Sequence, residues 1–367
     1  MGRIFRPYWK KLISRSINDE SKLPGIVSLS FEEKEYINSL KQRGLLPFVI
    51  NPWLAGKLGE SLAEHPEIPP GKNPLRLQLI PSPEEDNILE NELEDPLGEA
   101  EYRVFPRLVH QYPNRVLLLT TGNCISYCRH CFRRCYTSRG DGFISTKEQL
   151  EIAEYLKAHA EVKEILISGG DPLLYDDFRI KNLFGNLFKF RHDVLIRICT
   201  RAPVFLPQRF TKTLIKTLKA HRPLWLIPHI NHPWELTRET EKALRRVIDA
   251  GIPVQSQTVL LKGVNDNPDV LEELFNRLVF IGVKPGYLFQ TDLAPGTSHF
   301  RTFIDYGLKI YSELEKRLSG LSLPVYAVDL PGGGGKIPLI SHKAEKSDNL
   351  YYYYKSKTGK LYPYPKF

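Results

Sequence analysis

The sequence predicts an α/β fold with a parallel sheet, and two observations lead to this fold class. From Arg115 onward, short apolar runs typical of buried strands alternate with longer amphipathic stretches that have helical spacing. Strands that are separated by helices in this way pair in parallel as βα units. Six or seven such units suit a closed or partly closed barrel, whose active site lies at the carboxyl ends of the strands.

The predicted strands are apolar runs bounded by turn residues. They span 115–121, 164–170, 194–200, 224–230, 254–261, 287–292 and 325–330. The first helix is expected at 146–159, with Thr146 as its N-cap and acids in its first turn. Further helices are expected in 181–190, 211–221, 238–251, 271–282 and around 303–318.

Composition changes on both sides of this core. Residues 1–100 are expected to form a mostly helical N-terminal extension that ends in an acidic arm, 101–322 the barrel core, and 323–367 a C-terminal segment with a basic tail. Nine acids and no base lie between Glu84 and Glu101, so we expect the stretch 81–101 to run over the surface. In the tail, residues 349–365 predict a hairpin with its turn at Lys357–Gly359.

The overall composition bounds the class of protein. With 42% hydrophobic and 25% charged residues, a disordered or collagen-like chain is excluded. The net charge of +9 is moderate. No apolar run reaches the ~18 residues that span a bilayer, and the basic N-terminus lacks the apolar core of a secretory signal. We therefore expect a soluble cytoplasmic protein.

Four of the five cysteines form a cluster. Cys124, Cys128, Cys131 and Cys135 fall within twelve residues, directly after the first predicted strand. Such clustering indicates metal or redox chemistry in a reducing compartment. Three thiolates could hold an iron–sulfur cubane with one open iron, whereas a fourth from Cys135 would close a zinc or ferredoxin-type site. Buried thiols without a ligand are a third interpretation.

Four consecutive glycines, Gly332 to Gly335, precede Lys336. A phosphate-binding loop of the Walker type requires Ser or Thr after the lysine, and here Ile337 follows. A flexible linker is the structural alternative.

Several motifs together resemble one enzyme family. CISYCRHC resembles the CxxxCxxC motif of the radical S-adenosylmethionine (SAM) enzymes, and ISGGD at 167–171 resembles their SAM-binding motif. With HINHP, QSQTVLLKGVND, FQTDLAPGTSHFRT and VDLPGGGGKIPL, the chain resembles the lysine 2,3-aminomutase family over roughly residues 95–340. This resemblance implies a partial (βα)6-type radical SAM barrel.

The resemblance also implies the cofactors and their residues. Cys124, Cys128 and Cys131 would hold a [4Fe-4S] cluster. SAM would contact His130, Ser168, Gly169, Gly170, Asp171, His229 and Gln257, although a surface role for His130 and interior polar roles for His229 and Gln257 remain open. Lys336 would carry pyridoxal 5′-phosphate (PLP) as a Schiff base. Tyr112 and Arg115 are the candidate phosphate contacts, and Gln111 replaces an arginine common in the family.

Three residues match the family's contacts to substrate lysine. Arg133 would pair with the carboxylate, and Asp292 and Asp329 with the ε-ammonium, or the two aspartates could form structural ion pairs. The implied function is the conversion of L-lysine to β-lysine, with a flavodoxin- or ferredoxin-type electron donor and no nucleic-acid or membrane partner. The oligomeric state stays open.

The same chemistry on a lysine of translation elongation factor P is the nearest alternative. Phe132, Pro172 and the basic tail favour it, and no cysteine follows Cys199 to form the zinc site of many free-lysine enzymes. Asp329 favours free lysine. An electron carrier that uses Cys135, or a basic nucleic-acid-binding protein, would be a function of another class.

Overall fold

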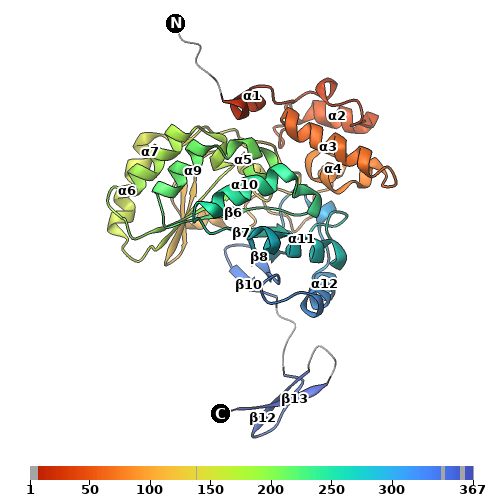
Figure 1. Ribbon diagram of the computed structural model, residues 1–367, viewed down its shortest axis with the longest axis vertical. Coiled ribbons are helices and arrows are strands. Elements are labelled where there is room, and N and C mark those ends of the chain that lie inside the picture. The colour runs from red at the N-terminus through yellow and green to blue at the C-terminus, as the bar shows by residue number, and fades with distance from the viewer. Residues whose placement is uncertain (1–6, 138, 340–343, 356–359, 367) are drawn as a thin grey trace.

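Seven parallel strands form the centre of the protein in a computed structural model, which describes residues 7–137, 139–339, 344–355 and 360–366 (Figure 1). They are β3 (Arg115–Leu119), β4 (Glu164–Ser168), β5 (Leu195–Thr200), β6 (Leu224–Pro228), β7 (Gln255–Val259), β8 (Lys284–Phe289) and β9 (Val325–Leu330). All seven lie where the sequence predicts a strand, except that β8 starts and ends three residues earlier. Asp292 therefore lies in the loop after β8.

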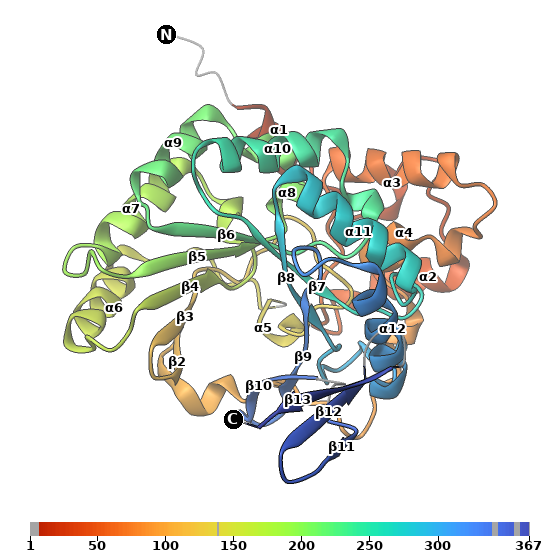
Figure 2. The ribbon, with the colours of Figure 1, turned by 60° about the horizontal axis from the view of Figure 1, so that its bottom comes forward.

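The strands curve into a partial barrel (Figure 2). One sheet has the order β1-β2-β3-β4-β5-β6, a second has the order β10-β9-β8-β7, and single bridges at Leu226–Val254 and His229–Gln257 join them. The outer strands β1 (Arg103–Phe105), β2 (Leu108–Tyr112) and β10 (Gly335–Pro338) pair antiparallel with their neighbours. The sequence analysis missed these three short strands.

Helices cover the outside of the barrel, because each carries one apolar stripe that packs on the strands. They are α6 (Thr146–Ala158), α7 (Asp177–Leu187), α8 (Ala202–Phe205), α9 (Lys212–Ala220), α10 (Arg238–Asp249), α11 (Pro268–Ile281) and α12 (Ile304–Arg317). The predicted N-cap of α6 is wrong by one residue. Ser145 is the cap, and Ser145 and Glu148 bond to each other's backbone as a capping box.

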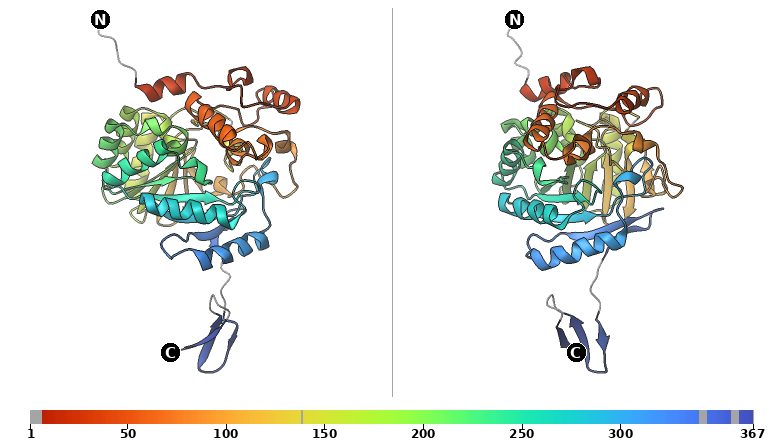
Figure 3. Two further views of the ribbon diagram at one scale, coloured as in Figure 1. Left: turned by 45° about the vertical axis from the view of Figure 1, so that its right-hand side comes forward. Right: turned by 90° about the vertical axis from the view of Figure 1, so that its right-hand side faces the viewer.

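The N-terminal extension packs against one side of the barrel (Figure 3). Its helices are α1 (Tyr8–Ser14), α2 (Phe31–Leu40), α3 (Pro52–Glu64) and α4 (Pro74–Leu79). Most residues of the acidic arm are exposed, as expected, but three of its acids are buried. Glu85, Glu92 and Glu99 are buried, and each pairs with an arginine of the barrel loops, which compensates its charge.

The C-terminal tail forms a small three-stranded sheet that lies apart from the barrel (Figure 1). Its strands are β11 (Lys346–Ser347), β12 (Tyr351–Lys355) and β13 (Leu361–Pro365). The antiparallel pairing of β12 and β13 confirms the predicted hairpin, and its turn at 357–359 lies outside the described residues. Within the described part of the chain, we find no helix with the length and apolar character to cross a membrane.

Candidate active site

A cavity of about 500 Å³ opens at the carboxyl ends of the strands and extends into the barrel. Every site residue that the sequence singled out lies in its wall. The set comprises Tyr112, Arg115, Cys124, Cys128, His130, Cys131, Arg133, Ser168, Gly169, Gly170, Asp171, His229, Gln257, Asp292, Asp329 and Lys336. Residues from the strands β2 to β10 and their loops thus meet in one space.

The cysteine loop follows β3 and is fixed by contacts to the N-terminal extension. Ser126 Oγ donates to the carbonyl of Val49 at 2.7 Å, and the backbone N–H of Arg129 donates to that of Gln78 at 3.0 Å. The guanidinium of Arg129 donates to the carboxylate of Glu85 and to the carbonyls of Leu46 and Pro47. The loop conformation is therefore specified by residues distant in sequence.

The three thiols fit an iron–sulfur cluster. Burial raises the pKa of Cys131 to about 11, and it raises the pKa of Cys124 well above its ordinary value, with the neighbouring cysteines adding to both. A thiol with a raised pKa, such as that of Cys124 or Cys131, becomes a thiolate only against a compensating positive charge, which a bound metal centre would provide. Within the described ranges, no three His, Cys, Asp or Glu side chains converge on a single metal ion. Cys135 lies outside the cavity lining.

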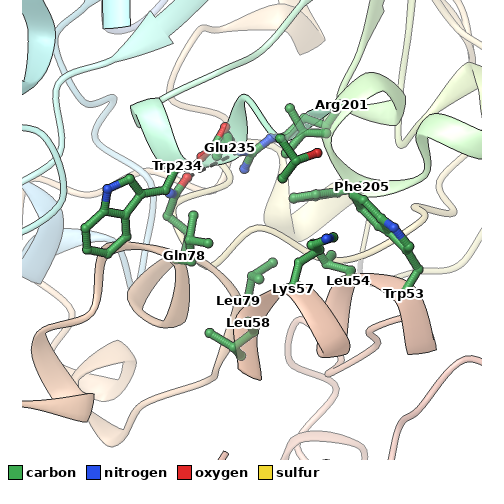
Figure 4. Close-up of a pocket in the computed structure, with 13 residues that line it drawn as sticks. Trp53, Leu54, Lys57, Leu58, Gln78, Leu79, Arg201, Phe205, Trp234 and Glu235 are labelled. Carbon is green, nitrogen blue, oxygen red and sulfur yellow. Dashed lines mark hydrogen bonds and ion pairs between the residues drawn. The ribbon is translucent and has the colours of Figure 1, made fainter. Parts of the chain in front are cut away.

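Arg201, after β5, supports this loop from behind. Its guanidinium lies 3.1 Å from Cys128 Sγ and donates to Glu235 at 2.8 Å and to Gln78 Oε1 at 3.3 Å. Figure 4 shows Arg201 and Glu235 facing each other beside a small pocket between α3, α4 and the barrel. Arg201 therefore couples Cys128 to the N-terminal extension through Gln78.

Two buried histidines lie beside the cysteine loop. Asn231 joins them, with its amide nitrogen 3.2 Å from His130 Nε2 and its oxygen 2.8 Å from His229 Nε2. Burial, with the charge of Arg201, lowers the pKa of His229 to about 3 and lowers that of His130 well below its ordinary value. Both rings are therefore neutral at pH 7. His130 is only 5% exposed, so the alternative of a surface histidine is wrong.

The two glycines of the ISGGD segment have a packing role. A Cβ on Gly169 would collide with the backbone of Thr121, and a Cβ on Gly170 with that of Asn123. Their small size thus lets β4 approach the start of the cysteine loop, a reason that the sequence analysis did not foresee. Asp171 accepts hydrogen bonds from Thr200 Oγ1 and from the backbone of Leu173 and Arg201.

Lys336 lies at the opposite end of the cavity, on β10. Its Nζ lies 2.8 Å from the carboxylate of Asp329 and 3.8 Å from the ring centre of Phe289. The register of β9 and β10 pairs Lys336 with Asp329 directly. Burial lowers the pKa of Lys336, although Asp329 and Asp292 oppose the shift. The hydroxyl of Tyr112 accepts a hydrogen bond from the backbone N–H of Lys336 at 3.0 Å.

Asp292 completes an acidic pair with Asp329. Burial raises the pKa of Asp292 to about 7, and the nearby charge of Asp329 adds to this shift. The cations of Lys336 and Arg133 act in the opposite direction. A carboxyl group with this pKa is partly ionised at neutral pH, and binding of a cation favours its ionised form.

Arg133 forms an ion pair with Glu99 of the acidic arm. Its guanidinium also lies over the ring of Phe132, with 4.5 Å between the guanidinium carbon and the ring centre. The Nε of Arg133 is buried and has no hydrogen-bond partner. The residue assigned to a substrate carboxylate thus already holds a carboxylate of the chain itself.

Sequence reasoning missed five residues of this site: Glu99, Arg201, Asn231, Tyr287 and Phe289. Tyr287 and Phe289 stack with ring centres 5.1 Å apart beside Lys336. Tyr287 and Phe289 are two residues apart on one strand, so the sequence could have predicted that both side chains lie on the same face of the sheet. Glu99 and Arg201 gave no such signal, because their roles depend on partners far away in the chain.

A partial βα barrel whose first loop holds three cysteines is the architecture of a radical SAM enzyme. The radical SAM superfamily model matches residues 118–275. Two relatives carry the name "Putative L-lysine 2,3-aminomutase". The first, from Treponema pallidum, is 52% identical over 73% of this chain and 75% of its own length, and the second, from Aquifex aeolicus, is 41% identical over 98% and 95%.

An L-lysine 2,3-aminomutase of Methanococcus maripaludis is 41% identical over 90% of this chain and 75% of its own length. The chain therefore belongs to the lysine 2,3-aminomutase family. It is an isomerase of the radical SAM class, and its family uses a [4Fe-4S] cluster, SAM and PLP.

Proposed function

We propose that this enzyme moves the amino group of L-lysine from the α- to the β-carbon in a PLP-dependent reaction. One observation carries the proposal: a single cavity joins three thiols at one end to Lys336 and two carboxylates at the other. When bound, the cluster and SAM supply a carbon-centred radical, and PLP on Lys336 supplies a π-system through which nitrogen can migrate. The chain's own residues then bind and orient the amino acid.

Arg133 fits the α-carboxylate of the substrate. A guanidinium presents several N–H donors in a planar fork, and its buried Nε has no partner within the protein. Charge-assisted hydrogen bonds of this kind fix both position and orientation. Arg133 follows Cys131 by two residues, so it holds the carboxylate next to the cysteine loop.

Asp292 and Asp329 fit the ε-ammonium. In the structure, the ammonium of Lys336 already lies against Asp329 and within the field of Asp292. We infer that the substrate ammonium would take this position when the Lys336 side chain turns away from Asp329 to hold PLP. One ammonium compensates one of the two carboxylates, and the pKa of Asp292, raised to about 7, reduces the remaining negative charge.

Tyr112, Arg115 and two aromatic rings define the PLP position. Arg115 lies over the Tyr112 ring, with 3.8 Å between the guanidinium carbon and the ring centre, and both line the cavity. We assign the phosphate to Arg115, and we add Arg197 on β5, whose buried Nε has no partner, as a further candidate. Tyr287 and Phe289 offer flat apolar faces to the pyridine ring.

His130, Ser168, His229 and Gln257 form the wall that we assign to SAM. The two histidines are neutral, so they can offer hydrogen bonds without repelling the sulfonium of SAM. We further propose that a flavodoxin- or ferredoxin-type protein donates the single electron that starts the reaction. The exposed tyrosines of β12 and β13 favour a second candidate, the same chemistry on elongation factor P.

Anaerobic incubation of the holoenzyme with SAM, a reductant and L-lysine tests the proposal. We expect β-lysine to accumulate, detected by mass spectrometry after derivatisation. Norleucine is the matched control, because it has the same carbon chain and no ε-ammonium, and we expect at most about a hundredth of the lysine rate. Turnover of lysine on elongation factor P without turnover of free L-lysine would replace this proposal by the second candidate.

A further inference from the structure

The end of the acidic arm forms a structured turn inside the cavity wall. The carboxylate of Asp95 accepts hydrogen bonds from the backbone N–H groups of Glu99 at 3.0 Å and Ala100 at 2.7 Å. Gly98 has a φ of 63°, which closes the turn in the left-handed region that favours glycine. These contacts orient the Glu99 side chain, which is 11% exposed, toward Arg133.

The same turn also contacts the glycine loop that precedes Lys336. A Cβ on Gly98 would collide with the backbone of Gly332 and Gly333, and a Cβ on Gly333 would lie 2.7 Å from the Tyr102 ring. Gln111 donates to the carbonyl of Gly333 at 3.0 Å. The turn at 95–102 is therefore packed between Arg133 on one side and the loop of Lys336 on the other.

Glu99 and a substrate carboxylate would be competing ligands of Arg133. Both are anions that seek the same guanidinium in a largely buried space, and two adjacent carboxylates repel each other. The additional negative charge of Asp292 and Asp329 in the same cavity makes a further carboxylate at Arg133 less favourable while Glu99 remains there. The simplest resolution is that one carboxylate replaces the other.

We propose that Glu99 is a specificity-determining residue that occupies Arg133 in the absence of substrate and yields it to the α-carboxylate of lysine. This inference rests on the proposed function, because it takes Arg133 as the carboxylate site. An amine without a carboxylate cannot displace Glu99, so the turn keeps its resting position against the glycine loop. Occupation of the cavity by an amino acid is thereby distinguished from occupation by a simple diamine.

Binding measurements on the holoenzyme test the competition. S-adenosylhomocysteine replaces SAM, so that no turnover occurs, and Kd values of L-lysine and cadaverine are measured by calorimetry. Cadaverine is lysine without its carboxylate. We expect Glu99→Gln to lower the Kd of L-lysine by about tenfold, as removal of a competing internal ligand does, and to leave that of cadaverine unchanged. Glu101→Gln, in the same turn and exposed, is the matched control and should change neither.

Hydrogen exchange of the wild-type holoenzyme gives a second readout that needs no variant. We expect exchange of the backbone amides in 95–102 to increase on addition of L-lysine and to stay constant with cadaverine. An unchanged or higher Kd of L-lysine in Glu99→Gln, or the same exchange with both ligands, would overturn the inference. If the wild type neither binds L-lysine nor forms β-lysine, the proposed function itself fails, and the inference fails with it.

Discussion

The two ends of the cavity are held in place by different kinds of contact. At the cysteine end, Glu85 has no exposed side-chain surface and pairs with both Arg129 and Arg134, and Arg201 pairs with Glu235 behind Cys128. At the lysine end, Lys336 pairs with Asp329, and the next residue of its strand, Ile337, is 40% exposed. The ion pairs behind the cysteines are thus more deeply buried than the pair at Lys336, and we propose that only the latter exchanges partners.

This difference follows from what each end has to do. A cluster remains bound through every reaction cycle, so its loop gains from partners that are buried and permanent. An amino acid enters and leaves, so its arginine and its carboxylates must have partners that they can release. The ion pairs of Arg133 with Glu99 and of Lys336 with Asp329 resemble the two charged ends of the substrate itself.

The largest expected effect is the loss of the cluster. Cys124→Ala, Cys128→Ala and Cys131→Ala should each abolish activity and prevent assembly of an intact [4Fe-4S] cluster, because three thiolates are the minimum for a cubane with one open iron. Iron and sulfide analysis with the absorbance spectrum measures this. Cys135→Ala is the matched control and should keep its iron. Loss of the cluster in that variant would contradict the assignment of three ligands.

A substitution of Lys336 should abolish the function of the lysine end of the cavity and leave the cysteine end intact. Lys336→Ala should keep the cluster and bind SAM, yet lose all amino migration, because no other residue is assigned to carry PLP. Borohydride treatment of the wild type should fix PLP covalently on Lys336, as peptide mapping would show. Lys346→Ala, in the tail sheet, should behave as wild type. A PLP adduct on any other lysine would remove this part of the proposal.

The contribution of the buried ion pairs at the cysteine end can be tested by measuring the free energy of unfolding. Glu85→Gln should lower the free energy of unfolding by about 3–5 kcal/mol, because it leaves two buried arginines without their anion. Urea unfolding followed by circular dichroism measures the change. Asp86→Asn removes a neighbouring acid whose ion pair with Arg43 is exposed, so it should have little effect. Equal effects of the two variants would show that the buried pairs do not hold this end.

At the lysine end, a variant should affect binding of the substrate more than generation of the radical. Asp329→Asn should reduce kcat/KM for L-lysine on the order of 100-fold, because it removes one partner of a partly buried charge pair. Reductive cleavage of SAM in the absence of lysine should change far less. Asp305→Asn, exposed on α12, is the control. A variant that processes L-lysine normally would exclude Asp329 from the ammonium site.

The smallest expected effect is a dependence on pH. The pKa of Asp292 is raised to about 7, so its carboxyl group is mainly ionised above this pH and neutral below it. The ε-ammonium of lysine is charged throughout this range. We therefore expect kcat/KM for L-lysine to fall about tenfold from pH 8 to pH 6, and Asp292→Asn to abolish this dependence while lowering kcat/KM at pH 8. If kcat/KM of the wild type does not change between pH 6 and pH 8, ionisation of Asp292 is not required for binding of the ε-ammonium.

Much of the fold could be predicted because the barrel repeats one local pattern. Most of the parallel strands, such as β3 to β6, are rich in apolar residues, and in β3, β4, β5 and β7 buried residues alternate with partly buried ones that face the cavity. The strands β1, β2 and β10 gave no such signal, since they contain polar residues, glycine or proline and are partly exposed. The cap of α6 was misplaced because Ser145 and Thr146 are both good N-caps.

Some residues of the candidate site could likewise be predicted from the sequence, and others could not. Cys124, Cys128, Cys131 and Lys336 could be predicted because their motifs are local in the sequence. The role of Glu99 could not, because nine acids in one stretch give the pattern of a solvated arm and three of them are buried against arginines. Charge alone does not say which acids will find a buried partner.

The sequence by itself predicted a closed or partial barrel from the alternation of strands and helices, and its motifs singled out the cysteine cluster and the lysine after four glycines through their resemblance to a known family. Only the tertiary structure decided that the acidic arm enters the cavity wall and that Arg133 and Lys336 already hold carboxylates of the chain. The physical reason is that the stability of a buried ion pair depends on desolvation and on the distance between its partners. Both quantities exist only after segments far apart in sequence, such as Glu99 and Arg133, have been brought together by folding.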